Sequence, residues 1–488
     1  MSSRGRLLAG RRPFDLWSYL VIITLGGYMF FGRPFAYLAI PGTPLYIGEL
    51  VMILGVVEAL LAGRAMWTVI EASPTLKVLL AFMAWCAFRL IEGITSYGLD
   101  AVRDSALWYY ATFAFITATA ALVNEQFVPR VLKWYRWALP AFLLWAPVAV
   151  FISRVPSLSE VTFLTDAPVN GIKPGDVAIH VALAIVFLWF QLDRVLEVGK
   201  MSTWRAALPY IGLAGLLVAG SQGRSGFLGA VVTIGIGLFM LTKGERRRIV
   251  LSSTLGLTVI VVVALTLNLR FSFGQEGDRE FSVQQVLTNV ESIVGGSSSG
   301  GDEGALQGNE SWRLEYWSGV WRDAYSPQYL LTGQGFGPVL SFKYGIEDPD
   351  DPDNTQPLRS VHNSHLTVLA RVGWPGAILW LAVWFVWLKG ISRWVRGRRS
   401  RTWGPVARLA AWCAGGVCGF LLNAFFDPAL DGPMCGVWTW FLVGLGVAYV
   451  DGFRLQRMGY NIRLPLAGGD GRDGAPERSP ASEPAEVS

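Results

Sequence analysis

Charged residues are scarce in this chain of 488 residues. Asp, Glu, Lys and Arg make up 16% of it, against about 25% in soluble globular proteins, while 52% is hydrophobic and the mean hydropathy is +0.40. So little charge is typical of a polytopic membrane protein. The composition excludes a cytosolic enzyme, a secreted disulfide-rich protein and a nucleic-acid-binding protein.

Residues that hold metals or form disulfides are also few. The sequence has three His and four Cys, and each Cys lies within or at the edge of an apolar segment. Cys-x-x-Cys and His-x-x-Glu-His patterns are absent, so we predict no metal site and no cofactor. The predicted inner loops lack the glycine-rich motif that cradles nucleotide phosphates. The energy for a reaction must therefore come from the substrate itself.

Long apolar runs dominate what the sequence does contain. A membrane-spanning helix needs about 20 mostly apolar residues. We predict an all-α polytopic membrane protein with about twelve such helices and one large external loop. The predicted helices occupy residues 14–32, 44–62, 75–94, 105–124, 137–153, 176–192, 204–222, 225–242, 248–269, 373–391, 406–426 and 431–451.

The charges of the connecting loops predict the orientation of these helices. Basic residues recur in every second loop, as in Arg130, Lys133 and Arg136, and this excess marks cytoplasmic loops. Both ends of the chain are therefore predicted to be cytoplasmic. The predicted division is helices one to nine in residues 1–269, an external loop in 270–372, helices ten to twelve in 373–451, and a cytoplasmic, mostly disordered tail in 452–488.

The external loop is long enough to have a function of its own. Apolar residues at helical spacing predict an amphipathic helix at the membrane surface over 282–294, and a second helix is predicted over 310–325. Residues 295–309 are rich in Gly and Ser, and they are either a hinge for a closing gate or an idle linker. The acidic residues 347–354 lack the pattern of a calcium loop and predict a solvated turn.

Cationic residues and all three histidines gather on the predicted outer side, where the distribution of basic residues in membrane proteins leaves few. Arginine donates paired hydrogen bonds to phosphate oxygens and stays charged, so such a set suits a diphosphate. The alternative is pairing with anionic lipid headgroups or with Glu92, Asp104 and Glu315. The set comprises Arg103, Lys173, His180, Arg224, Arg313, Arg322, Arg359, His362 and His365.

Arg224 and His362 are the strongest candidates in this set. Arg224 lies in the turn Ser221-Gln222-Gly223-Arg224-Ser225-Gly226, whose glycines let the backbone pass close to a ligand. His362 and His365 are three residues apart and would share one face of a helix. A histidine titrates close enough to neutral pH to act as a general base.

The residues around His362 resemble a known signature. The run His362-Asn363-Ser364-His365-Leu366, followed by Gly373 and Gly376, is similar to the His-Asn-x-x-Leu…Gly-x-x-Gly pattern of the O-antigen ligase and polymerase superfamily. The resemblance spans roughly residues 205–450, although members often carry an acidic residue at the position of Arg371. Three further features match: the arginine-bearing turn before the eighth helix, Arg313 with Trp317 and Trp321 followed by Gly333-x-Gly335-x-Gly337, and about twelve helices around one large external loop.

The resemblance implies a metal-independent, inverting glycosyltransferase of the bacterial inner membrane, with its active site on the outer, periplasmic face. Its partners would be a glycan donor linked to undecaprenyl diphosphate, a glycan or lipid-glycan acceptor, and membrane lipids, but no nucleic acid. His362 would be the general base, and Arg224 and Arg313 the catalytic cations. The substrate-binding residues would be Arg103, Lys173, His180, Arg322, Asn363 and His365.

Two alternatives remain open. A polymerase of polysaccharide repeat units would use the same donor and differ only in its acceptor. A small-anion transporter would also attract its substrate with external cations. Transporters, however, place ionisable groups near the middle of the membrane, where the predicted segments carry almost none. We therefore favour a ligase-like transferase.

Overall fold

The computed structural model describes residues 13–162, 165, 167–192, 203–272, 280–294, 303–346, 358–397 and 404–457. Within them every regular element is a helix, and the β contacts are three isolated bridges. The prediction of an all-α protein is confirmed. The Gly/Ser-rich residues 295–302, the acidic stretch 347–354 and the tail beyond Arg457 lie outside the described residues.

A helix is found at each of the twelve predicted apolar segments. These helices are α1 (Asp15–Phe31), α3 (Ile47–Leu61), α5 (Pro74–Tyr97), α8 (Thr112–Val123), α9 (Phe127–Ile152), α10 (Pro174–Trp189), α12 (Leu208–Gln222), α13 (Arg224–Met240), α14 (Lys243–Thr266), α18 (Ser364–Gly397), α19 (Pro405–Asn423) and α20 (Pro433–Arg457). Short helices join them: α2 (Arg33–Ala36), α4 (Ala65–Ala72), α6 (Leu99–Asp104) and α7 (Ala106–Tyr109).

The helices differ in whether they are long enough to cross a membrane. In the described part of the chain six are long and apolar enough, or eight if each of two bent pairs counts as one span. The bends are 97° between α3 and α4 and 44° between α7 and α8. Helices α1, α10 and α13 are apolar but shorter. A membrane protein with several spanning helices is thus established, and the number twelve stays a prediction.

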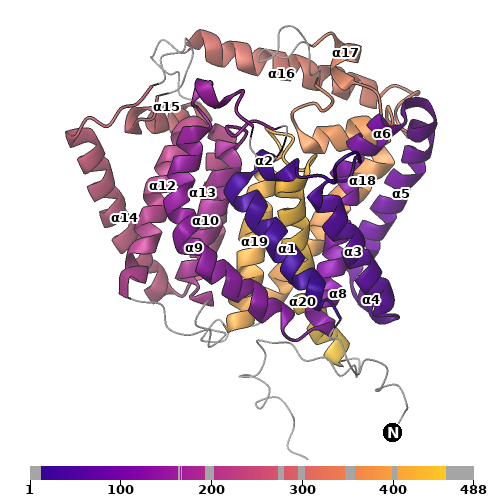
Figure 1. The fold of residues 1–488 in the computed structure, drawn as a ribbon, viewed down its shortest axis with the longest axis horizontal. Helices are drawn as coiled ribbons and strands as arrows, with labels where there is room; N and C mark the ends of the chain where they lie inside the picture. Colours follow the sequence, from indigo (N-terminus) through magenta and orange to yellow (C-terminus); the bar gives the residue numbers. More distant parts are fainter. Residues whose placement is uncertain are drawn as a thin grey trace, which may run out of the picture.

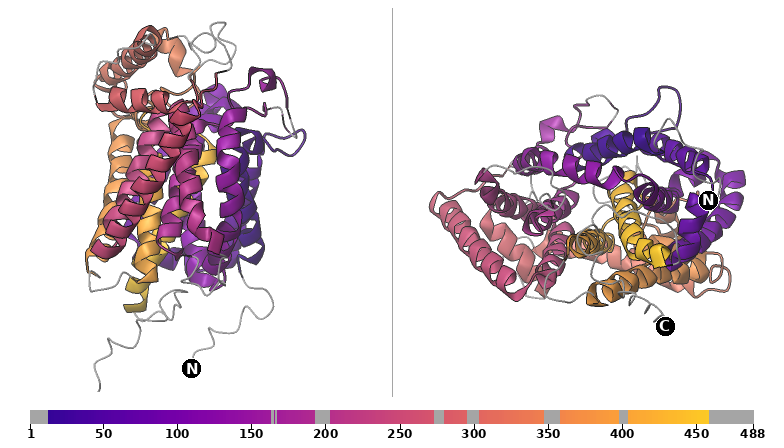
Figure 2. Two further views of the ribbon diagram at one scale, coloured as in Figure 1. Left: turned by 90° about the vertical axis from the view of Figure 1, so that its left-hand side faces the viewer. Right: turned by 90° about the horizontal axis from the view of Figure 1, so that it is seen from below.

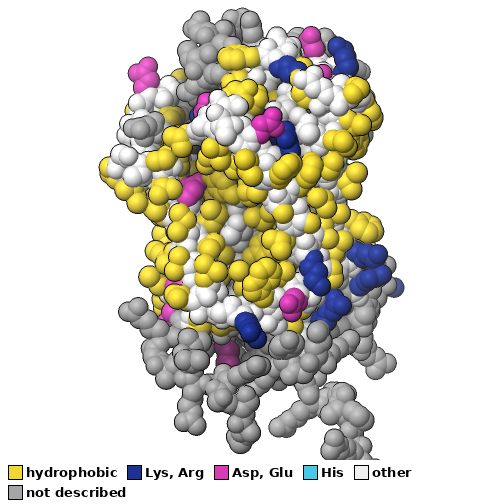
Figure 3. Space-filling model, turned by 90° about the vertical axis from the view of Figure 1, so that its right-hand side faces the viewer, with side chains coloured by type: hydrophobic (Ala, Val, Ile, Leu, Met, Phe, Trp, Pro, Cys, Tyr) yellow, Lys and Arg dark blue, Asp and Glu magenta, His cyan; other side chains and the backbone are white. Residues whose placement is uncertain are grey.

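The helices run side by side in one bundle, and the segment between α14 and α18 covers one end of it (Figures 1 and 2). We call this end, which carries α15 (Val283–Val294), α16 (Glu303–Ala324) and α17 (Leu340–Tyr344), the loop end. The first and last described residues lie at the opposite end. A broad band of hydrophobic side chains separates the two ends on the face drawn in Figure 3. Such a band fits a protein embedded in lipid.

Helix α10 forms the centre of the half of the bundle that carries the site. All its residues from Val177 to Trp189 are buried, and it packs against α9, α12, α13 and α19. A β-carbon on Gly226 would overlap the backbone of Gly175, so the start of α13 rests directly on the start of α10. Small residues permit this close approach of helices in membranes.

Of the two helices predicted in the loop, α15 lies at the predicted place and α16 starts earlier than predicted. Helix α15 lies where an amphipathic helix was predicted, and its Asn289 Nδ2 donates hydrogen bonds to the carbonyls of Gly220 and Ser221 (2.8 and 3.1 Å). These bonds satisfy carbonyls that the end of α12 leaves unpaired, and they hold α15 across it. Helix α16 begins at Glu303, seven residues before the predicted start at 310.

Helix α18 also begins earlier than predicted, at Ser364 instead of residue 373. It is broken at Gly373, where φ is 66° and ψ is −172°, a conformation that favours glycine. The segment Gly333–Gly337 fills the break: Gln334 N donates to Ala370 O (2.7 Å) and Gly335 N to Arg371 O (2.9 Å). These glycines form a turn that lies against α18, called the glycine turn below.

A buried carboxylate fastens this glycine turn to the bundle. Asp104, at the end of α6, pairs with Arg359 (2.8 Å) and with Arg371 (2.9 Å), and it accepts a hydrogen bond from Gly337 N (2.8 Å). Its side chain is 5% exposed and that of Arg371 is 1% exposed. Pairing with Asp104 is the sequence-based alternative to binding a diphosphate, and for Arg359 this pairing is observed. We call Asp104, Arg359 and Arg371 the clamp.

We predict that Asp104→Asn lowers the free energy of unfolding by about 3–5 kcal/mol, because it leaves the buried Arg371 and the partly buried Arg359 without this carboxylate. Asp100→Asn is the matched control. Asp100 lies on the same helix and is 3.5 Å from Arg359, but its side chain is 58% exposed, so its loss is expected to cost less than about 1 kcal/mol. Equal losses in unfolding titrations of the detergent-solubilised protein would contradict the clamp.

Candidate functional site

An ion pair at the loop end joins two segments that are far apart in sequence. Lys173 Nζ, just before α10, lies 2.7 Å from Asp427 Oδ1, in the turn between α19 and α20. Beside it, Asn423 Nδ2 donates a hydrogen bond to Asp176 Oδ1 (3.2 Å). The start of α10 and the end of α19 are therefore tied together by polar side chains, in a bundle whose other contacts are mainly apolar.

Asp427 also attracts residues from the loop. Burial alone would raise its pKa, but the Lys173 ammonium with its hydrogen bond, and the charges of His362 and Arg313, together hold the pKa of Asp427 below its ordinary value. Arg313 Nη1 donates to the carbonyl of the adjacent Phe426 (3.3 Å). Four separate segments thus meet at Asp427, and we call Lys173, Arg313, His362 and Asp427 the site cluster.

The backbone around His362 is fixed by hydrogen bonds. Asn363 Oδ1 accepts from the backbone N–H groups of His365 and Leu366 (3.0 Å each), which makes Asn363 the N-cap of α18. Ser364 N donates to Ala424 O (2.8 Å), in the turn that carries Asp427. His362 itself has φ 50°, which is uncommon for a residue other than glycine, and its ring meets that of Trp312 edge-on at 5.4 Å.

The expected sharing of one helix face by His362 and His365 is wrong, because α18 begins only at Ser364. His365 points into the protein instead. Its Nδ1 accepts from Trp380 Nε1 (3.0 Å), so Nε2 carries the proton and donates to Leu421 O (3.0 Å). Both ring nitrogens are thus engaged with protein groups. His365 supports the turn beside the site cluster instead of joining it.

Arg224 lies at the junction of the same elements. It is the first residue of α13 and half-buried. The glycines on either side of it, Gly223 and Gly226, face Gly175, two residues after Lys173. The arginine-bearing turn is thus placed at the start of α10, at the end of the bundle that carries the site cluster. These glycines permit close contact between helices, and the approach of a ligand at this turn stays a prediction.

Three other predicted residues are not brought to the cluster. His180 lies about 10 Å further along α10 than Lys173, is 2% exposed, and packs against the rings of Phe420 and Trp438 (5.2 and 5.1 Å). Arg103 is exposed on α6. Arg322 is exposed on α16 and follows Arg313 by about two and a half turns, which places it on the opposite side of that helix.

The sequence interpretation missed Asn423, Asp427 and Asp431. They lie at the turn between α19 and α20, which the twelve-helix prediction treated as a plain connection. The signal was present: two aspartates four residues apart interrupt an otherwise apolar pair of helices. Ionisable residues at such places are rare in membrane proteins and usually have a function.

The pKa values of the two aspartates in this turn, Asp427 and Asp431, are shifted in opposite directions. Burial raises the pKa of Asp431 to about 6, and the neighbouring Ser364 hydroxyl and Arg371 guanidinium offset this only in part. The pKa of Asp427, in contrast, is held low by the cations around it. At neutral pH both carboxyl groups are charged, but Asp431 carries its charge at an energetic cost.

We therefore predict opposite effects of two matched substitutions. The stability contributed by neutral Asp431 is present below its ordinary pKa of 3.8 and lost as the pH rises through about 6. Above pH 7, Asp431→Asn should thus raise the free energy of unfolding by up to about 3 kcal/mol, and with it the melting temperature. Near pH 4 it should have little effect. Asp427→Asn should lower it at pH 7, because the stability from ionised Asp427 is lost only at acidic pH.

Thermal unfolding of the two variants between pH 4 and 8, followed in detergent, measures both effects. If the melting temperature of Asp431→Asn equals that of the wild type at every pH in this range, ionisation of the buried Asp431 does not cost stability, and the prediction is wrong.

A family model matches part of the chain. Residues 209–381 match the family model described as O-Antigen ligase. The matched segment contains Arg224, Arg313 and His362, whereas Lys173 and Asp427 lie outside it. No curated protein matches the chain. The family match confirms the resemblance to the O-antigen ligase superfamily found in the sequence, over about a third of the chain.

Proposed function

We propose that the protein transfers an oligo- or polysaccharide from a polyprenyl diphosphate carrier to an acceptor hydroxyl, as an inverting, metal-independent O-antigen ligase of the bacterial inner membrane. The loop end would face the periplasm. The observation that carries the proposal is the convergence of Arg313 and His362, from the family-matched segment, on Asp427 beside Lys173. Arg224 joins them at the start of α13.

The cations of the site suit the leaving group of this reaction. When the bond between the sugar and the diphosphate breaks, negative charge gathers on the diphosphate oxygens. Lys173 and Arg313 attract the Asp427 carboxylate, and Asp176 attracts Lys173 as well, so a diphosphate would replace these carboxylates as the partner of the two cations. Arginine holds such an anion with paired hydrogen bonds and stays charged throughout. We assign this role to Arg313 and Arg224, with Lys173 in support.

His362 is assigned to the acceptor. The acceptor oxygen forms a bond to the anomeric carbon while the bond from that carbon to the diphosphate oxygen breaks, and the polyprenyl diphosphate leaves with the electron pair. The acceptor proton passes to the His362 imidazole. The nearby Asp427 carboxylate stabilises the imidazolium that forms, because opposite charges favour each other at short range. Trp312, against the ring, restricts its orientation.

We predict that His362→Ala slows glycan transfer in proteoliposomes by about 10²–10⁴-fold while the donor still binds, because it removes the base. Arg313→Ala is expected to slow transfer by about 10²–10³-fold and also to weaken donor binding, because it removes charge from the leaving-group side. Glu315→Gln, at an exposed position of the same helix, is the control and should stay within about twofold of wild type. Full transfer by a folded, inserted His362→Ala protein would refute the assignment.

The acceptor is tested separately in a deletion strain. A ligase acts on finished chains, so its loss should leave long glycans attached to the lipid carrier. A polymerase joins repeat units, so its loss should leave single units on the carrier. We expect long carrier-linked chains, detected by extraction of the lipid-linked glycans and sizing on gels; single units would replace the ligase by the polymerase.

A further inference from the structure

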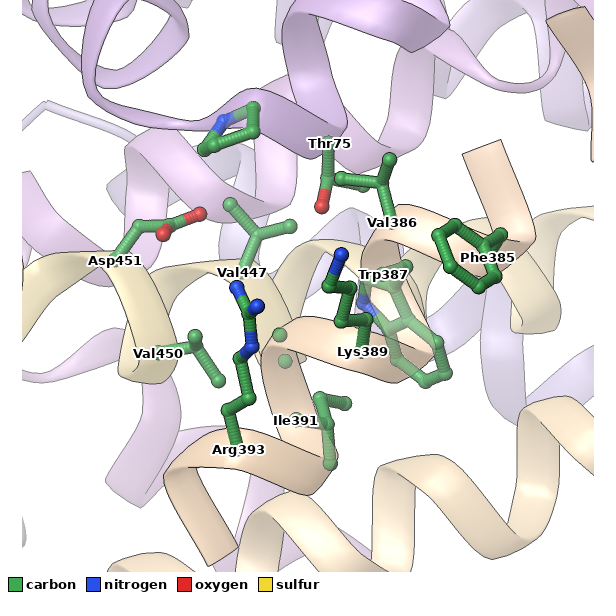
Figure 4. A pocket seen from close by; sticks show the side chains of 13 residues that line it. Thr75, Phe385, Val386, Trp387, Lys389, Ile391, Arg393, Val447, Val450 and Asp451 are labelled. Carbon is green, nitrogen blue, oxygen red and sulfur yellow. The ribbon is translucent and has the colours of Figure 1, made fainter. Parts of the chain in front are cut away.

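A cavity at the opposite end of the molecule plays no part in glycan transfer. It lies between the start of α5 and the last turns of α18 and α20 and has a volume of about 260 Å³. This is slightly below the range of about 300–1,000 Å³ for sites of drug-sized ligands. Its walls include Trp387, Ile391 and Val447, and Figure 4 shows Lys389 and Arg393 extending into the same space.

The charges around the cavity favour an anion. In the described part of the chain no carboxylate lies within ion-pair distance of Lys389 or Arg393, and both side chains are exposed. The cavity also contains Asp451, but Ser73 and Arg454 already attract this buried carboxylate. Lys389 and Arg393 thus line a cavity whose carboxylate is already attracted by Arg454, so a phosphate placed between them would balance their charge.

An apolar strip leads from the cavity along the outside of α18. Ile378, Leu381 and Phe385 are 59%, 59% and 64% exposed, and they follow the same helix face as Lys389 and Arg393. From Ile378 to Lys389 the helix rises about 16 Å, close to half of the ~30 Å hydrocarbon core. The Lys389 ammonium lies 5.2 Å from the Phe385 ring, where the apolar strip meets the cations.

We infer that this cavity and strip bind one anionic glycerophospholipid, with its phosphate between Lys389 and Arg393 and an acyl chain along Ile378, Leu381 and Phe385. Basic pockets between membrane helices recognise lipid headgroups in this way. The length of the strip favours a lipid over a free phosphate, because a free phosphate has no apolar part to contact the strip. The inference is independent of the proposed glycan transfer and needs only that the protein lies in a membrane.

Native mass spectrometry of the full chain in detergent, with added phosphatidylglycerol or phosphatidylcholine, tests this inference. We expect the wild type to retain one phosphatidylglycerol in preference to phosphatidylcholine. Lys389→Gln and Arg393→Gln should each weaken retention roughly fivefold. Lys243→Gln removes an exposed lysine from α14, at the same end of the molecule but outside the cavity, and should leave retention unchanged.

Gly390→Leu tests the cavity without changing the charge. Gly390 lines the cavity, and a β-carbon there would meet no atom closer than 3.8 Å, so a larger side chain starts in open space at the cavity wall. It should abolish the preference for phosphatidylglycerol while the thermal transition stays intact. Undiminished retention in Gly390→Leu, or an equal loss in Lys243→Gln, would overturn the inference. So would displacement of the lipid by glycerol 3-phosphate at equal concentration, because the ligand would then be a soluble phosphate.

Discussion

The clamp at Asp104 is the contact on which the arrangement of the loop end depends. Its carboxylate lies between two guanidinium groups: Arg359 also meets the exposed Asp100, and Arg371 donates to the carbonyls of Pro338 and Arg359 (2.8 and 2.6 Å). These carbonyls are in place only when the glycine turn is folded against α18. The turn, α6 and α18 therefore assemble together, and Arg359 is fixed three residues before His362.

The clamp and the site cluster differ in how their charged groups are paired and exposed. In the clamp every charged group has protein partners and little exposure, which rigidifies the backbone but leaves nothing for a ligand. In the site cluster, Lys173 and Asp427 keep 27% and 26% of their side-chain surface exposed. Charged groups that are partly solvated and close together are able to exchange water for a charged substrate. Stability and recognition are thus placed on neighbouring but separate residues.

The apolar segments predicted the helices well, because a run of some twenty apolar residues has few alternatives in a membrane. The ends of helices were predicted less well. The apolar run predicted a helix from residue 373, yet the helix extends back to Ser364 because the glycine turn replaces the hydrogen bonds lost at the break at Gly373. Asp427 was missed for a related reason: its partners come from three distant segments, and their convergence is a property of the packing.

The position of α16 decides how far Arg313 lies from His362, and the packing argues that this helix is firmly docked. Trp317 Nε1 donates to Val361 O (2.9 Å), next to His362, and Trp374 Nε1 donates to Ala324 O (3.0 Å) at the end of α16. Tyr316 and Val320 are 0% and 1% exposed, in a small core shared with α18. Swinging α16 outward would expose both, at roughly 1.5–3 kcal/mol for each side chain. A gate that opened by lifting this whole helix would therefore be costly, and a substrate that enters sideways from the membrane has to reach Arg313 while α16 stays in place.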